Sequence, residues 1–182
     1  MKSRWAFGFC LAASLLQAST AAADEDDEES PTFPGLLARY SSAGKVIERT
    51  DETIAFEWGA NSPDPRLSPA PFLANWSGTL LVRPTTKYRF HAWLHGDVTV
   101  LINGVTVLSD ERRTPGWVTG PTAPLKSGDA KIEIAYRSRP EKAALKLFWS
   151  SETFALEPLP RLASVHEERR GLVVGDGVGH RH

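Results

Sequence analysis

Cysteine is almost absent from this chain: its 182 residues include one, Cys10, which lies in an apolar N-terminal stretch. The rest of the chain therefore has no disulfide framework, no thiol nucleophile and no cysteine-bound metal. It must be held together by burial of apolar side chains. A chain of this length can bury about two thirds of its unfolded surface, so we expect one domain with one core.

Long apolar runs are also missing. The longest, Trp5–Leu16, is shorter than the about 20 residues that a helix needs to cross a bilayer. Lys2 and Arg4 precede this run, and small residues follow it up to Ala23. This order is typical of a secretory signal rather than of a buried N-terminal helix. We predict a signal peptide at residues 1–23, no membrane span, and a mature protein that is secreted, periplasmic or in the cell envelope.

Basic character is missing as well. The formal net charge is −1, and it becomes −3 without the two N-terminal cations. Six adjacent carboxylates at Asp24–Glu29 supply −6 of this, which leaves +3 for the remainder and does not suggest a nucleic-acid-binding protein. The carboxylates repel one another and lack the spacing of a calcium loop, so we assign residues 24–34 to an acidic disordered spacer.

Common catalytic motifs are absent too. The sequence lacks G-x-S-x-G, H-E-x-x-H and a phosphate-binding loop. Few acids lie in apolar segments, and Glu57 and Glu133 alternate with apolar neighbours, which places them on the solvent side of strands. We therefore predict that the protein is not an enzyme.

Short alternating segments fill most of the chain. In Tyr88–Leu94 every second side chain is apolar, which predicts a half-buried strand, and Asn103-Gly104 between two β-rich runs predicts a hairpin. Prolines between residues 63 and 71 indicate a loop. Further strands are expected near residues 36–40, 53–58, 77–82, 131–136 and 145–149. The pattern predicts an all-β antiparallel β-sandwich or barrel as a single domain over residues 35–160, followed by a flexible tail at 161–182.

Several short motifs occur in the order and spacing of a known domain. They are G-L-L-A-R-Y at Gly35–Tyr40, I-A-F-E-W at Ile54–Trp58, an F…N-W-S-G-T-L element at Phe72–Leu80, Y-R-F at Tyr88–Phe90, L-I-N-G at Leu101–Gly104, an L-K-S-G…I-E-I-A-Y element at Leu125–Tyr136 and L-K-L-F-W at Leu145–Trp149. Together they make the chain resemble the protective-antigen-type domain, the PA-14 β-barrel family. The resemblance implies an antiparallel β-sandwich or barrel of exported proteins, whose members often bind carbohydrate.

The resemblance also implies a place for a ligand site. Sugar-binding members of the family carry two adjacent aspartates and a glycine before the strand that ends in Asn103-Gly104 here, and these carboxylates hold a calcium ion. This chain has His95-Gly96-Asp97 at that place, so one carboxylate remains. Calcium prefers six to eight oxygen ligands, usually with several carboxylates. We therefore predict no cofactor, with a weak calcium site at this loop as the alternative.

Candidate ligand-binding residues lie around this loop, because sugar sites combine an apolar face with a few convergent polar groups. They are Trp93, His95, Asp97, Asn103 and Trp117. The two tryptophans offer ring faces and the other three offer hydrogen bonds; an ordinary strand-end turn with a rim aromatic is the alternative. The polar segment Asp110–Arg113 is expected to be a solvated loop. The remaining strand tryptophans are expected in the core: Trp58, Trp76 and Trp149.

Two functions remain open. The first is an exported, non-catalytic binding module that recognises a polysaccharide or glycan through loops at one end of the sandwich. The second is an interaction or spacer domain of a larger exported assembly with no small-molecule ligand. Glycan binding that falls when Trp93 or Asp97 is replaced by alanine would favour the first. The sequence names neither a particular sugar nor a protein partner.

Overall fold

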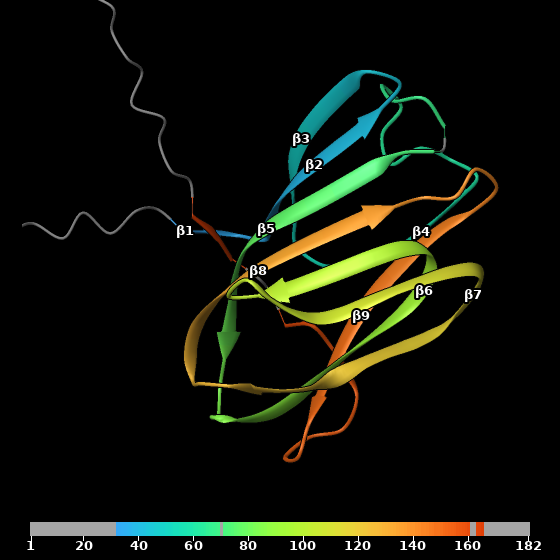
Figure 1. The fold of residues 1–182 in the computed structure, drawn as a ribbon. Helices are drawn as coiled ribbons and strands as arrows, with labels where there is room; N and C mark the ends of the chain where they lie inside the picture. The colour runs from blue at the N-terminus through green and yellow to red at the C-terminus, as the bar shows by residue number, and fades with distance from the viewer. Residues whose placement is uncertain (1–31, 70, 161–162, 166–182) are drawn as a thin grey trace, which may run out of the picture.

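The computed structural model describes residues 32–69, 71–160 and 163–165, and every regular element within them is a β-strand (Figure 1). The strands are β1 (Thr32–Pro34), β2 (Leu36–Ser42), β3 (Lys45–Asp51), β4 (Ala55–Gly59), β5 (Leu73–Val82), β6 (Thr86–Ile102), β7 (Val105–Leu125), β8 (Gly128–Arg137), β9 (Ala143–Ser151), β10 (Glu157–Pro158) and β11 (Ala163–Val165). Their described pairings are all antiparallel, which confirms the predicted fold class. The part of the chain that the structure describes contains no helix able to span a membrane.

Some predicted segments lie at or beyond the edges of this description. The predicted signal peptide, the acidic run Asp24–Glu29 and residues 166–182 of the predicted tail are outside the described residues. The short strands β1 and β11 pair with each other, and they lie just outside the predicted domain bounds of 35–160. The sheet thus joins the two ends of the described chain.

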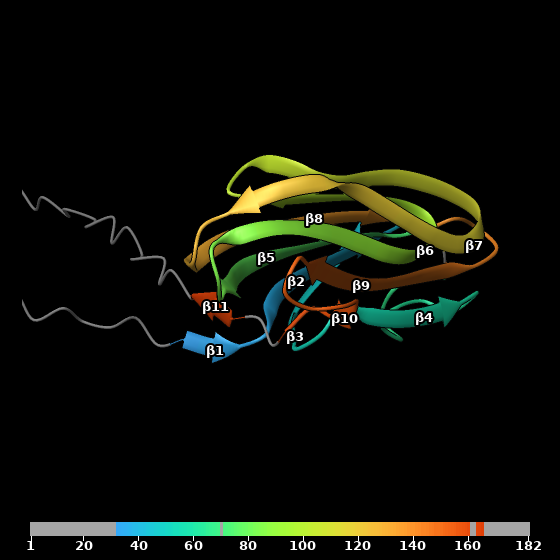
Figure 2. The same cartoon turned by 90° about the horizontal axis from the view of Figure 1, so that it is seen from below.

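The sheet folds over at β6. The first part of this strand, Tyr88–His95, pairs with β9, and its second part, Asp97–Ile102, pairs with β8, while β7 follows its other edge. One layer therefore has the order β3-β2-β5-β8-β6, and the other has the order β6-β9-β4 (Figure 2). The change of partner occurs at Gly96, whose φ of 133° suits glycine because it has no Cβ.

The core lies between the two layers and is built from every second residue of the strands. On β6, Tyr88, Phe90, Ala92 and Leu94 are buried, as the alternation in the sequence predicted. The tryptophans expected in the core are also buried: Trp58, Trp76 and Trp149. Full burial of one large apolar side chain contributes about 1.5–3 kcal/mol. Repeated burial of this kind stabilises the domain without a disulfide.

The strand β7 is longer than the sequence predicts. The expected polar loop at Asp110–Arg113 is wrong, because these residues lie within β7, with Arg112 opposite Gly96 and Asp110 opposite Val98 of β6. Among the described strands, β7 pairs only with β6, so it is an edge strand. Charged side chains and proline are tolerated on edge strands, where they hinder pairing with another chain. This is why a strand here has the composition of a loop.

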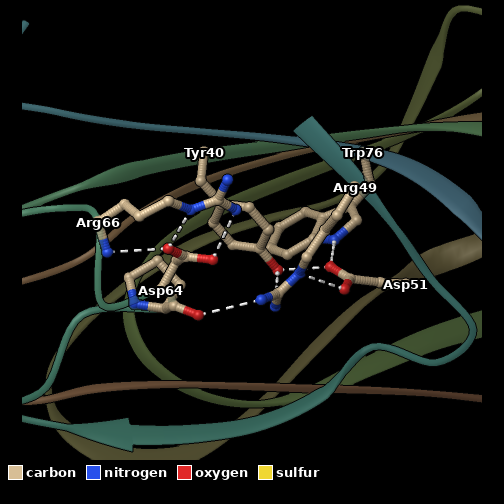
Figure 3. Close-up of polar contacts among 7 residues, drawn as sticks. Tyr40, Arg49, Asp51, Asp64, Arg66 and Trp76 are labelled. Carbon is tan, nitrogen blue, oxygen red and sulfur yellow. Dashed lines mark hydrogen bonds and ion pairs between the residues drawn. The ribbon is translucent and has the colours of Figure 1, made fainter. Parts of the chain in front are cut away.

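A buried polar cluster ties β2, β3 and β5 to the loop that precedes β5 (Figure 3). The Asp51 carboxylate accepts hydrogen bonds from the Tyr40 hydroxyl, from Trp76 Nε1 at 2.8 Å and from Arg49 Nε at 2.7 Å. The Arg49 guanidinium also donates to the Pro63 carbonyl at 3.0 Å and lies 4.6 Å from the centre of the Tyr40 ring. Burial, together with the bond to Asp51, raises the pKa of Tyr40, so its hydroxyl remains a donor.

The loop between β4 and β5 contains the proline cluster, as expected from the sequence. Its turn is closed by Asp64, whose carbonyl accepts a hydrogen bond from the Leu67 amide at 3.0 Å. The Arg66 side chain donates to the Asp64 carboxylate, and this hydrogen bonding lowers the pKa of Asp64 to about 2 (Figure 3). The loop therefore keeps the Asp64 carboxylate ionised and paired with Arg66 even in mildly acidic solution.

Candidate functional site

Two of the predicted site residues, Trp93 and Trp117, contact each other on the outside of the sheet. They are direct neighbours across β6 and β7, and their ring centroids lie 5.8 Å apart with the planes at 69°. Phe148 of β9 extends this contact, at 5.1 Å from the Trp117 ring. Ala92 and Leu94 on either side of Trp93 point into the core, so Trp93 points outward. We call Trp93, Trp117 and Phe148 the aromatic platform.

The aromatic platform is open to solvent. Trp117 keeps 48% of its surface exposed, and Trp93 and Phe148 are partly exposed. The Arg112 guanidinium donates to the Trp117 carbonyl at 2.9 Å, which fixes the backbone of β7 beside the ring. Single exposed apolar residues are common on proteins, whereas adjoining aromatic rings on a surface indicate a place for a ligand or partner.

A groove of about 330 Å³ adjoins the aromatic platform on the same sheet face. It is lined by Lys87, Tyr88, Arg89, His91, Thr122, Ser150, Ser151 and Glu152, and we call it the polar groove. His91 Nδ1 lies 3.0 Å from the Thr119 hydroxyl, and His91 Nε2 lies 2.9 Å from the Ser150 hydroxyl. Arg89 donates to the Thr122 hydroxyl at 2.9 Å. Hydroxyls, a histidine and a guanidinium thus converge beside the aromatic rings.

The histidine in the polar groove has a lowered pKa, which favours its neutral form. Burial, and then the nearby Arg89 guanidinium, lower the pKa of His91 below its usual value of about 6.5. A neutral imidazole has one donor and one acceptor nitrogen, so it can exchange hydrogen bonds with hydroxyls in either direction. Both ring nitrogens are engaged by the Thr119 and Ser150 hydroxyls, so His91 orients these two hydroxyls on the sheet face.

The lowered pKa of His91 predicts a pH dependence of stability. The unfolded chain takes up a proton at this histidine before the folded chain does, so the free energy of unfolding should fall as the pH drops below about 6.5 and level off below the folded pKa. A His91→Gln variant should lose this part of the dependence. Urea unfolding of both proteins at about pH 7.5 and about pH 5 measures it. An equal loss of stability in both proteins would contradict the prediction.

His95 and Asp97 lie at the bend of β6, beyond the aromatic platform. The His95 side chain is buried, and its carbonyl accepts a hydrogen bond from the Tyr136 hydroxyl. Asp97 is partly exposed and pairs with the Arg139 guanidinium at 2.5 Å. Asp97 lies four residues from Trp93, about 13 Å along a strand, with a bulge between them. The structure therefore separates both residues from the aromatic platform: His95 is buried, and Asp97 is held in an ion pair.

Asn103 is further away still. It forms the β6–β7 turn with a positive φ of 49°, as the Asn-Gly signal predicted. Its amide donates to the Lys131 carbonyl at 2.8 Å, and its side-chain oxygen accepts from the Lys131 amide at 2.8 Å. Asn103 is ten residues from Trp93, up to about 33 Å along the strand. Its polar groups fasten the turn to β8 and do not share a surface with the tryptophans.

The residues around His95-Gly96-Asp97 do not fit a calcium ion. The described residues contain no group of three histidine, cysteine, aspartate or glutamate side chains that could hold a metal. The nearest cation to Asp97 is the Arg139 guanidinium, which also reaches Glu111 at 3.4 Å. Calcium needs several oxygen ligands at one point, whereas this carboxylate is already neutralised by a protein cation. Asp97 and Glu111 therefore form an ion-pair cluster with Arg139 and do not provide the set of oxygen ligands that calcium needs.

Sequence reasoning missed Phe148, His91 and the hydroxyls of the polar groove. A signal for Phe148 exists, because Leu145, Leu147 and Trp149 alternate with it and fill the core. The sequence thus places Phe148 on the outer face of β9. It does not show that β9 lies beside β6, which is what brings Phe148 to Trp117.

The described chain is thus an all-β module of two antiparallel layers, with the aromatic platform and the polar groove on its outer face. A family model described as the PA14 domain matches residues 28–158, and the chain belongs to this family. This confirms the resemblance found in the sequence motifs.

Individual proteins similar to this chain include anti-sigma factor proteins and a sugar-binding adhesin domain. The chain is 30% identical over 137 residues to the Anti-sigma-I factor RsgI3 of Acetivibrio thermocellus, covering 69% of this chain and 20% of that protein. An anti-sigma factor domain-containing protein from Clostridium clariflavum has a TM-score of 0.68 at 22% identity, covering 78% of this chain and 51% of that one. A PA14 sugar-binding domain from an RTX adhesin has a TM-score of 0.61 at 15% identity, covering 72% and 98%. The two structural likenesses show the fold.

Proposed function

We propose that this protein is an exported, non-catalytic module that recognises a polysaccharide or glycan. The observation that carries the proposal is the contact between Trp93 and Trp117 on an outward sheet face, extended by Phe148. Sugar rings have apolar C–H faces and polar edges, so they bind where exposed aromatic rings lie beside hydrogen-bonding groups. The structurally similar domain from an RTX adhesin is a sugar-binding domain, which agrees with this class of ligand.

The proposed mechanism uses stacking first and hydrogen bonds second. A sugar ring lies on the exposed face of Trp117, and its hydroxyls bond to the side-chain hydroxyls of the polar groove. The proposed contacts hold the ligand and include no step in which a bond of the ligand is made or broken. They also do not use Asp97, which is paired with Arg139, so we propose binding without calcium.

An interaction or spacer role is the second candidate. The chain spans about one fifth of the length of its relative RsgI3, which places a domain of this type within a larger protein there. In that role the aromatic platform would bind another polypeptide. The two functions differ in what retains the protein: a glycan alone in the first, and only a protein partner in the second.

Retention on immobilised polysaccharides tests the proposed function. We expect the wild-type protein to be retained by at least one polysaccharide, and Trp117→Ala to lower the affinity by about tenfold or more, because a stacked aromatic ring supplies well over 1 kcal/mol at such sites. Affinity gel electrophoresis and calorimetry measure both effects. The matched control is Leu81→Ala, which truncates a 55% exposed apolar residue on β5 and should bind like the wild type.

A chelator separates this mechanism from calcium-dependent recognition. We expect EDTA to leave retention unchanged. Equal retention of wild type and Trp117→Ala would remove the aromatic platform from the proposal. If no polysaccharide in a broad panel retains the folded wild-type protein, with or without calcium, the interaction or spacer role is the better description.

A further inference from the structure

The aromatic platform and the polar groove form one surface, because His91 of the polar groove lies beside Phe148 of the aromatic platform. Across β9 the backbone partner of His91 is Phe148, and across β7 its partner is Thr119. Its two ring nitrogens bond to hydroxyls on these same two strands, at Thr119 and Ser150. Hydrogen bonds thus connect outward side chains of β7, β6 and β9 across the sheet. We call this combined surface the sheet-face strip.

The sheet-face strip is longer than one sugar ring. From Trp93 to Lys87 the strip follows six residues of β6, about 20 Å, and its three strands give it a width of about 10 Å. Polar lining residues occupy the groove half of this length, while aromatic rings occupy the other half. A single bound monosaccharide would contact only one of the two halves.

The strip lies on a sheet face rather than in a closed pocket. At the groove end β6 begins at Thr86 and β9 ends at Ser151, so the strip reaches the rim of the sheet, and at the other end β6 bends at Gly96. Its hydrogen-bonding groups come from neighbouring strands that pair with one another, so they are held in place before a ligand arrives. A preformed surface that is open at the rim of the sheet favours an extended ligand that can continue beyond it.

We infer that the sheet-face strip binds an internal stretch of an extended, flat polysaccharide, such as a β-1,4-linked chain, without calcium. This inference rests on the proposed function and specifies its ligand. Consecutive sugar rings lie on the aromatic platform and then over the polar groove, where the Ser150 and Thr122 hydroxyls exchange hydrogen bonds with ring hydroxyls and His91 holds Ser150 in place. Recognition by the family's calcium loop, in contrast, would need the carboxylate of Asp97, which is engaged by Arg139.

A length series of oligosaccharides tests the inference. For cello-, xylo- and manno-oligosaccharides, we expect the best-binding series to gain about tenfold or more in affinity from disaccharide to hexasaccharide, as the polar groove becomes occupied. The corresponding monosaccharide should not compete. Calorimetry with the full chain gives each affinity.

Variants in the two halves of the strip should behave differently. Ser150→Ala and Thr122→Ala should lower hexasaccharide affinity severalfold and leave disaccharide affinity unchanged, whereas Trp117→Ala should lower both. The matched control is Ser109→Ala, because the Ser109 hydroxyl bonds to Thr99 at 3.3 Å on the same two strands, β7 and β6, beyond the bend at Gly96. The control should bind both ligands like the wild type.

The possible results separate the inference from the function on which it rests. Polysaccharide retention without any gain from disaccharide to hexasaccharide, or full competition by a monosaccharide, would overturn the inference and leave glycan recognition standing. Binding that is unchanged by Trp117→Ala, Ser150→Ala and Thr122→Ala would also overturn it. Absence of all glycan binding would remove the proposed function itself, and self-association lost in Trp117→Ala would then assign the strip to a second copy of the chain.

Discussion

Replacing Asp51 with alanine will lower the free energy of unfolding by about 3–5 kcal/mol, a large fraction of the total for a domain of this size. Asp51 is 8% exposed, and its carboxylate accepts from Tyr40, Arg49 and Trp76. Alanine would leave the Arg49 charge without its carboxylate and two buried donors without an acceptor. Each of these losses costs free energy, because water does not replace the missing partner in the core.

Urea unfolding followed by circular dichroism measures this effect. An Asp51→Asn variant keeps the shape and part of the hydrogen bonding, so we expect it to lie between the wild type and alanine variants. The control is Glu133→Ala, which removes a carboxylate from the exposed ion pair with Lys131 at 3.0 Å and should cost at most about 1 kcal/mol. If Asp51→Ala costs no more than Glu133→Ala, the buried cluster does not hold the first hairpin to the sheet.

The Asp51 cluster also shows where sequence reasoning ends. Alternation in Tyr88–Leu94 and the Asn103-Gly104 turn are local signals, so they predicted a strand and a hairpin that the structure contains. A carboxylate at the end of β3 carries no such signal. Its role depends on β2 and β5 lying side by side, which is a pairing between segments more than thirty residues apart.

The same reasoning explains the candidate site. The sequence selected Trp93 and Trp117 as separate residues, and only the register of β6 against β7, shifted by bulges, brings their rings together. His95, Asp97 and Asn103 are grouped with them because the resemblance to the PA-14 family places its site loop at this stretch of the sequence. A strand advances about 3.3 Å per residue, so nearness in sequence places them progressively further along β6. A site on a sheet face is assembled across strands, and cross-strand neighbours are not visible in a single sequence.

The bend at Gly96 separates the two layers of the sheet, and it also separates the aromatic platform from the Asp97–Arg139 ion pair. On one side of it, β6 pairs with β9 and carries the aromatic platform; on the other, it pairs with β8 and carries Asp97 beside Arg139. A straight β6 would keep one partner along its length, and the sheet would not fold over. The geometry of one glycine thus underlies both the core and the placement of the sheet-face strip.

Replacing Gly96 with alanine will destabilise the domain by about 3–5 kcal/mol through two separate causes. The φ of 133° is unfavourable for any residue with a Cβ, and the added Cβ would lie 2.5 Å from the Arg137 carbonyl and 2.7 Å from the Tyr136 ring. The control is Gly44→Ala: Gly44 has a φ of 79° but no atom within 4 Å of the added Cβ, so it isolates the backbone cost of roughly 1–2 kcal/mol. Thermal and urea unfolding of both variants measure the difference. Equal costs would mean that β6 shifts at the bend to accommodate the methyl group, and that close packing against β8 does not hold the fold there.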